Sequence, residues 1–148
     1  EHEVLQVCPE VLGGLPTPRA CAEISGEYIM NTEGEDVTAQ FKKGAALALA
    51  QIREFQPDLV ILQPRSPSCG KGIIYDGSFQ NRLVEGDGMF ARLLLDEGIP
   101  VMTCGEFLEE VKPLSTKGLE MHGKPMGKAI FLEKKRIKDC KWYQNGLK

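Results

Sequence analysis

One short stretch constrains the fold more than any other part of this chain. An uninterrupted aliphatic run, Leu59 to Leu62, leads directly into the loop Gln63-Pro64-Arg65-Ser66-Pro67-Ser68-Cys69-Gly70-Lys71-Gly72. Four consecutive aliphatic residues are typical of a parallel strand that is covered on both faces. The prolines favour extended backbone in the residues before them, and the glycines permit conformations that other residues resist. The loop therefore suits an anionic or metal-bound ligand, although an ordinary strand-to-helix turn with one buried cysteine is the alternative.

The preceding residues predict a strand and a helix that lead up to this run. A short apolar strand over residues 4–7 ends at Cys8, and a hairpin or another excursion of the chain is expected around residues 24–30. A helix follows over about residues 37–55, with Asp36 as its N-cap, because apolar side chains recur there at helical spacing. A strand, a helix and a strand in this order are typical of a crossover between parallel strands.

The pattern repeats downstream of the loop. A helix is expected over residues 89–95, with Asp87 as its cap, followed by a strand over residues 99–103 that ends at Cys104. Beyond residue 111 the signal weakens, and residues 129–132 are either one more strand or a docking segment. The predicted fold class is α/β: a single domain with a mostly parallel sheet and helices on both faces, in a Rossmann-like arrangement.

Charge divides the chain into two parts. Residues 112–148 hold 10 of the 18 basic residues but 3 of the 21 acidic ones. We expect residues 1–111 to form the α/β domain and residues 112–148 to be a basic C-terminal extension docked on that acidic body. A nucleic-acid contact through the basic tail is the other interpretation, and charge alone does not choose between them.

The expected compartment is the cytoplasm. No apolar run approaches the roughly 20 residues of a membrane span, and the opening Glu1-His2-Glu3-Val4 does not have the form of a signal peptide. The five cysteines are an odd number without a Cys-x-x-Cys pair, which favours a reducing environment over a disulfide framework or a zinc finger.

Three of the cysteines follow predicted strands. Parallel sheets bind ligands beyond the carboxyl ends of their strands, so Cys8 and Cys69 are expected to meet at that edge from adjacent strands. Two thiolates there are plausible ligands for an iron–sulfur group or another thiophilic metal, and Cys104 is a third candidate on the same edge. Cys21 and Cys140 are interpreted as packing or surface residues.

Several longer motifs resemble a known family. The chain is similar to the DUF523 or TudS family of thiouracil desulfurases over roughly residues 1–110. The motifs that carry this resemblance are Cys8-Pro9-Glu10-Val11-Leu12-Gly13-Gly14-Leu15-Pro16-Thr17-Pro18-Arg19, Gly34-Glu35-Asp36-Val37-Thr38, Ser66-Pro67-Ser68-Cys69-Gly70 and Ile74-Tyr75-Asp76-Gly77-Ser78-Phe79.

The resemblance implies a [4Fe–4S] cluster held by three cysteines, with one iron open to the sulfur of a thiocarbonyl substrate. Cys8 and Cys69 match two of these ligands. The third belongs to an Ala-Cys-Leu-Leu-Gly motif on the family's first strand, which this sequence does not contain. Because Glu1 begins inside what the family would make its second strand, we expect the third ligand on a segment upstream of Glu1, with Cys104 as a possible replacement.

The resemblance also assigns two candidate catalytic residues. Glu10 matches an acidic residue that manages protons, and Ser66 matches a serine that orients substrate or water. The alternatives are a cap or surface charge for Glu10 and a turn hydroxyl bonded to its own loop for Ser66. Arg19 and Lys71 could neutralise a cluster or a substrate anion.

The predicted function is iron–sulfur-dependent desulfuration of a small thiolated pyrimidine base or nucleoside, such as 2-thiouracil. Two alternatives remain open at this point. One is a non-catalytic domain that binds a metal or small ligand, and the other is an enzyme that uses Cys69 as a nucleophile activated by Arg65 or Lys71.

Overall fold

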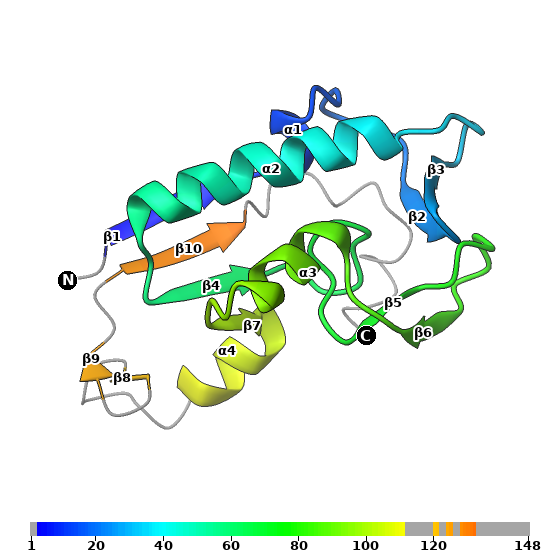
Figure 1. Ribbon diagram of the computed structural model, residues 1–148. Helices are drawn as coiled ribbons and strands as arrows, with labels where there is room; N and C mark the ends of the chain where they lie inside the picture. The colour runs from blue at the N-terminus through cyan, green and yellow to red at the C-terminus, as the bar shows by residue number, and fades with distance from the viewer. Residues whose placement is uncertain (1–2, 112–119, 122–123, 126–127, 133–148) are drawn as a thin grey trace.

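A four-stranded sheet forms the centre of the protein (Figure 1). The structure is a computed structural model that describes residues 3–111, 120–121, 124–125 and 128–132. The strand order is β1 (Glu3–Val7), β10 (Lys128–Leu132), β4 (Leu59–Leu62) and β7 (Val101–Thr103), and each strand runs parallel to its neighbours. The α/β class predicted from the sequence is confirmed.

The position of β10 corrects one prediction. β1 and β4 were expected to be adjacent, but β10 lies between them and pairs with both. Of the two alternatives for residues 129–132, the strand is therefore the one observed. The register aligns Val7 with Leu132, and Leu62 with Thr103, so the carboxyl ends of the strands lie at one edge of the sheet.

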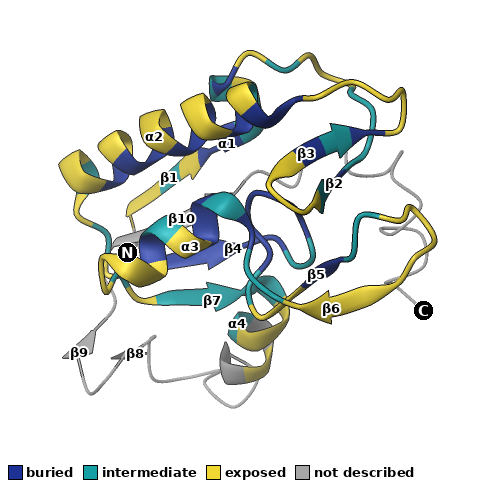
Figure 2. Ribbon diagram, turned by 45° about the vertical axis from the view of Figure 1, so that its right-hand side comes forward, coloured by how far each residue is buried: buried dark blue, intermediate teal, exposed yellow. Residues whose placement is uncertain are grey.

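Helices cover both faces of the sheet (Figures 1 and 2). On one face, α2 (Thr38–Phe55) and α3 (Met89–Asp96) pack over Val60 and Leu62. On the other face, α4 (Cys104–Val111) contributes Phe107 to a cluster around Leu59 and Ile61. All four residues of β4 are buried, as expected for a strand covered on both faces. None of the described helices is both long and apolar enough to cross a bilayer.

The two predicted helix caps are replaced by other arrangements. Helix α2 has Val37 at its N-cap, and the Asp36 carboxylate lies one residue further out, where its Oδ1 accepts a hydrogen bond from the Thr38 amide at 2.9 Å. Helix α3 has Gly88 at its N-cap, while Asp87 accepts a hydrogen bond from the Gly72 amide at 2.8 Å. The Asp87 prediction failed because backbone carbonyls, not a side chain, take up the first amides of α3.

Small elements surround the carboxyl edge of the sheet (Figure 1). The predicted hairpin is confirmed as β2 (Ala22–Ser25) and β3 (Tyr28–Asn31). A short helix and a second hairpin, not predicted from the sequence, lie near it: α1 (Pro9–Leu12), and β5 (Ile73–Tyr75) paired with β6 (Leu83–Glu85). At the opposite end of the sheet, β8 (Glu120–Met121) pairs with β9 (Lys124–Pro125) (Figure 1).

Two glycines let the backbones of α1 and α2 touch. A Cβ atom added at Gly44 would lie 1.7 Å from the Pro9 carbonyl oxygen, and one added at Gly13 would lie 1.9 Å from the Gln40 carbonyl oxygen. Neither position has room for a side chain unless the backbone moves. This contact holds α1, which begins at Pro9 directly after Cys8, against α2.

We expect Gly44→Ala to lower the free energy of unfolding. Alanine at an interior helical position would normally stabilise by about 1 kcal/mol relative to glycine. Here the added methyl group collides with the Pro9 backbone, so the net result should be a loss of about 1–3 kcal/mol. Chemical denaturation measures it, with the exposed neighbour Lys43→Ala as control, which should stay within about 0.5 kcal/mol of wild type. A Gly44→Ala protein as stable as wild type would contradict the α1–α2 contact.

Candidate functional site

Cys8 lies at the junction between β1 and α1. Its backbone is extended, with φ of −123°, and Pro9 occupies the first helical position, where the missing N–H costs nothing. The Cys8 carbonyl accepts a hydrogen bond from the Leu12 amide at 3.0 Å, which closes the first turn of α1 directly after the strand. The thiol is half-buried at the carboxyl edge of the sheet.

The loop that carries Cys69 is joined to the start of α3 by backbone hydrogen bonds. Amides at the helix start donate to loop carbonyls: Met89 to Pro67 at 2.8 Å and Phe90 to Ser68 at 2.9 Å. Gly88 sits so close that an added Cβ would lie 2.5 Å from the Ser68 carbonyl oxygen. The loop therefore acts as the cap of α3, and the helix holds the loop in one conformation.

Ser66 organises the same loop from inside. Its buried hydroxyl oxygen accepts hydrogen bonds from the amides of Ser68 at 3.0 Å and Cys69 at 3.1 Å. Arg65, just before it, has a left-handed φ of 66°, which turns the chain. The turn-forming interpretation of Ser66 is thus observed.

Cys69 lies within electrostatic range of Cys8 and Glu10. Cys69 is buried, and burial is the main cause that raises the pKa of its thiol well above the ordinary value. The nearby charges of Glu10 and Cys8 add to this rise. Both cysteines follow strands that end at the carboxyl edge of the sheet, where β10 separates β1 from β4.

Arg19 connects Glu10 with Cys8. Its Nε donates to Oε2 of Glu10 in an ion pair, and its Nη2 donates to Sγ of Cys8 at 3.5 Å. Burial alone would lower the pKa of Arg19, but Glu10 and Cys8 together raise it above its ordinary value. The sequence suggested Arg19 as a neutralising cation without identifying this partner. Lys71, suggested with it, pairs instead with Glu106 at 3.1 Å.

A cleft of about 280 Å³ opens beside Glu10 and Arg19. Its walls combine apolar groups with side chains that can form hydrogen bonds, among them Leu15, Pro16, Asn31, Gln40 and Phe41. This mixture is typical of a site for a small, partly polar molecule.

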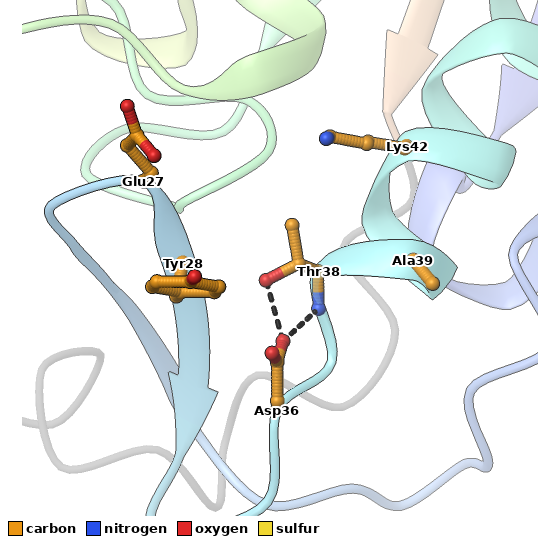
Figure 3. A pocket seen from close by; sticks show the side chains of 6 residues that line it. All are labelled: Glu27, Tyr28, Asp36, Thr38, Ala39 and Lys42. Carbon is orange, nitrogen blue, oxygen red and sulfur yellow. Dashed lines mark hydrogen bonds between the residues drawn. The ribbon is translucent and has the colours of Figure 1, made fainter.

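A second, wider hollow lies between the start of β3 and the first turns of α2 (Figure 3). It measures about 640 Å³, and its walls are formed by Glu27, Tyr28, Asp36, Thr38, Ala39 and Lys42. The Asp36 carboxylate there is engaged with Thr38. Among the described residues no cysteine lines the hollow or the cleft, but the cleft includes Arg19, which donates a hydrogen bond to Cys8.

Of the other cysteines in the described residues, neither Cys104 nor Cys21 joins this group. Cys104 starts α4 and packs with Met102 and Phe107 against Leu59 and Ile61, on the opposite face of the sheet from the cluster that contains Cys69. Cys21 is disulfide-bonded, and Cys140 lies outside the described residues. Within the described part of the chain, no three His, Cys, Asp or Glu side chains lie close enough together to hold a metal ion.

The β5–β6 hairpin is the element near the site that sequence reasoning missed. Glu23 on β2 holds its turn, since Oε1 accepts a hydrogen bond from the Gly77 amide at 3.1 Å. Burial raises the pKa of Glu23. The sequence signal for this hairpin was the close spacing of Gly72 and Gly77, which indicates a turn on each side of β5. Both glycines have a positive φ in the structure.

Comparisons with known proteins agree on one family. The family model described as 2-thiouracil desulfurase matches residues 2–106. An uncharacterized protein of Bacillus subtilis (strain 168), YbbK, is 41% identical over 116 residues, which are 72% of this chain and 77% of that protein. The solved structure of the [4Fe-4S]-dependent thiouracil desulfidase TudS is 43% identical with a TM-score of 0.66, covering 74% of this chain and 72% of that one.

We expect Ser66→Ala to destabilise the protein even without any ligand. The change leaves the buried amides of Ser68 and Cys69 without their acceptor, at a cost of about 1–3 kcal/mol in the free energy of unfolding. Urea denaturation of the metal-free protein measures it. Ser78→Ala, which alters an exposed serine bonded to Asp76, is the control and should have little effect. Equal losses in the two variants would show that the Ser66 bonds do not stabilise the loop.

Proposed function

The chain belongs to the 2-thiouracil desulfurase family, and from this premise we propose that it removes the sulfur of a thiolated pyrimidine such as 2-thiouracil with a bound [4Fe–4S] cluster. The observation that carries the proposal is that Arg19 contacts both Cys8 and Glu10, and that both of these lie within electrostatic range of Cys69. The described dependence of the TudS relative on a [4Fe–4S] cluster supports it.

The donor set fits a thiophilic group. Two sulfur atoms suit iron–sulfur chemistry and not Mg²⁺ or Ca²⁺, which prefer oxygen ligands. The elevated pKa of Cys69 means that its thiol stays protonated until a metal displaces the proton. Arg19, in contact with Cys8, offsets part of the negative charge of a thiolate-bound cluster. Cys8 and Cys69 are the proposed ligands, and Cys104 is set aside because it packs on the other face of the sheet.

The reaction exchanges sulfur for oxygen at one carbon. A thiocarbonyl and a water molecule give a carbonyl and hydrogen sulfide, so no oxidant or reductant is required. When bound, the cluster would supply an open iron position that acts as a Lewis acid on the sulfur. The protein's own residues place the water and move its protons.

Glu10 is the proposed proton-handling group. Its carboxylate takes a proton from the attacking water and can return it to the departing sulfur. The ion pair with Arg19 holds the carboxylate in one orientation at the mouth of the cleft. Gln40 can hydrogen-bond the polar edge of a pyrimidine ring, while Leu15 and Phe41 contact its faces.

Ser66 is proposed to orient substrate or water by donating a hydrogen bond from its hydroxyl group. Its oxygen already accepts two amide hydrogen bonds, which fix the position from which it donates. The rival mechanism, with Cys69 as a nucleophile, is disfavoured because burial holds that thiol protonated and because Lys71 is paired with Glu106.

Replacing either proposed ligand should abolish cluster retention. We expect Cys8→Ser and Cys69→Ser to lose most iron and sulfide after anaerobic reconstitution, since each removes a thiolate from an already small ligand set. Cys104→Ser, the matched control, should keep its iron. Iron and sulfide assays with the visible spectrum measure the result. Equal cluster content in all three variants would remove Cys8 and Cys69 as ligands.

Replacing Glu10 should separate chemistry from cluster binding. Glu10→Gln keeps the size of the side chain but cannot exchange a proton near neutral pH, so turnover of a thiouracil should fall by about 10²–10⁴-fold. The cluster spectrum should persist. Glu33→Gln, at another carboxylate that lines the same cleft, is the control and should keep most of its rate. Anaerobic turnover at matched cluster content is the measurement, and near-equal rates for Glu10→Gln and wild type would exclude Glu10 from the mechanism.

A further inference from the structure

Arg19 is a half-buried cation that is held from several sides. Its Nε donates to the Glu10 carboxylate, and its Nη2 donates to Sγ of Cys8 at 3.5 Å. Its Nη1 donates to the Pro16 carbonyl oxygen at 3.4 Å and to Oγ1 of Thr17 at 3.3 Å. Contacts through all three nitrogens fix the position of the planar guanidinium group.

The guanidinium has more donors than these contacts use. Each terminal nitrogen of an arginine carries two hydrogens. One hydrogen of Nη2 is used in the bond to Cys8, and no residue in the described part of the chain accepts the other. Arg19 also forms part of the wall of the cleft of about 280 Å³. A charged donor is therefore available to a molecule that enters the cleft.

The ion pair of Arg53 shows a different arrangement. Its Nε and Nη2 both donate to the Glu97 carboxylate, and its side chain is 62% exposed. Such a bidentate pair is the strongest contact between an arginine and a carboxylate. Arg19 gives Glu10 only its Nε, while its Nη2 contacts a sulfur atom. The Arg19 geometry thus keeps Nη2 out of the ion pair.

The proposed reaction places negative charge on sulfur. When water adds to the carbon of a thiocarbonyl group, the electrons of the carbon–sulfur double bond move onto the sulfur atom. A fixed cationic donor at that atom lowers the barrier more than it strengthens substrate binding, because the charge develops only during the reaction. Among the described residues that line the cleft, Arg19 is the one cation.

We propose that Arg19 is a catalytic residue that donates its remaining Nη2 hydrogen to the sulfur atom of the thiolated base while water adds to the carbon. This inference rests on the proposed function, because the charge on sulfur arises only in that reaction. The position of Nη2 supports the assignment. It contacts Cys8, a proposed ligand of the group that receives the sulfur, so it faces the sulfur end of the substrate.

The step balances without a proton from Arg19. The carbon–oxygen bond forms as the carbon–sulfur π bond opens, and Glu10 holds the proton that the water gives up. The remaining carbon–sulfur bond then breaks and the carbonyl forms. Both protons of the water leave with the sulfur as hydrogen sulfide. Arg19 stays protonated throughout, as arginines in proteins do.

A direct role and a purely positioning role for Arg19 predict different results once Glu10 is replaced. If Arg19 acts only by orienting Glu10, a change at Arg19 has no further effect in the Glu10→Gln protein. If Arg19 contacts the sulfur, the same change still slows the reaction. Arg19→Lys is the informative variant, since it keeps the positive charge but lacks the planar set of donors.

The test is a double-mutant cycle that combines Arg19→Lys with Glu10→Gln. Anaerobic turnover of 2-thiouracil is measured at matched cluster content. We expect Arg19→Lys to lower kcat in the Glu10→Gln protein by about 10–100-fold, the usual loss for a hydrogen bond to a charged group. KM should change little, because the contact strengthens in the transition state. Arg53→Lys, which alters an arginine–glutamate pair outside the cleft, is the matched control and should keep its rate.

A second measurement depends neither on turnover nor on iron. Uracil carries an oxygen in the place of the sulfur, so it should accept the same hydrogen bond from Arg19. Equilibrium dialysis of labelled uracil against the metal-free proteins gives the dissociation constant. We expect Arg19→Lys to raise this constant about tenfold and Arg53→Lys to leave it unchanged. Urea denaturation shows whether both variants are folded.

Two results would overturn the inference while the proposed function stands. One is an unchanged kcat when Arg19→Lys is added to Glu10→Gln, which would leave Arg19 only the orientation of Glu10. The other is equal or absent uracil binding in wild type and Arg19→Lys, which would remove the contact with the substrate. If loaded wild type releases no sulfide from 2-thiouracil, the proposed function itself fails and this inference falls with it. That result is seen before any variant is compared.

Discussion

The loop around Cys69 and the start of α3 satisfy each other's backbone. The first amides of a helix have no intrahelical partners, and the carbonyls of a loop that follows a buried strand need hydrogen-bond donors. Here the carbonyls of Pro67 and Ser68 accept those amides, so neither side needs a polar side chain for the purpose. Because α3 is itself packed in the core through Phe90 and Leu94, the position of Cys69 depends on the core of the domain and not on a flexible loop.

A second contact places the other half of the site. Gly13 and Gly44 bring the backbones of α1 and α2 together, and α1 carries Glu10 two residues after Cys8. Arg19 then ties Glu10 and Cys8 to the segment that leads toward β2. Each half of the site is thus attached to a helix that packs on the same face of the sheet. Such double attachment is what holds catalytic groups within a fraction of an ångström of their working positions.

The local features of this fold could be predicted where one physical signal dominated. The aliphatic run of β4 and the apolar stripe of α2 were recognised because burial dictates both patterns. The central place of β10 could not be predicted, since its partners lie far away in the sequence and nothing local specifies them. Asp87 failed as a cap because backbone carbonyls of a loop distant in sequence accept the first amides of α3. At the site, the motifs indicated Cys8, Glu10, Ser66 and Cys69, but the pairing of Arg19 required coordinates.

The insertion of β10 between β1 and β4 also bears on how the protein is made. Within the described sheet, β1 pairs only with β10, and their register joins Glu3 to Lys128. At ribosomal speeds of about 5–20 residues per second, β1 waits on the order of 10 s for its partner to be synthesised. During that interval the edge of β4 that β10 will occupy is also open. Unpaired strand edges are the surfaces on which chains associate wrongly, so the yield of folded protein should be more sensitive to crowding and chaperone supply than the stability of the finished domain would suggest.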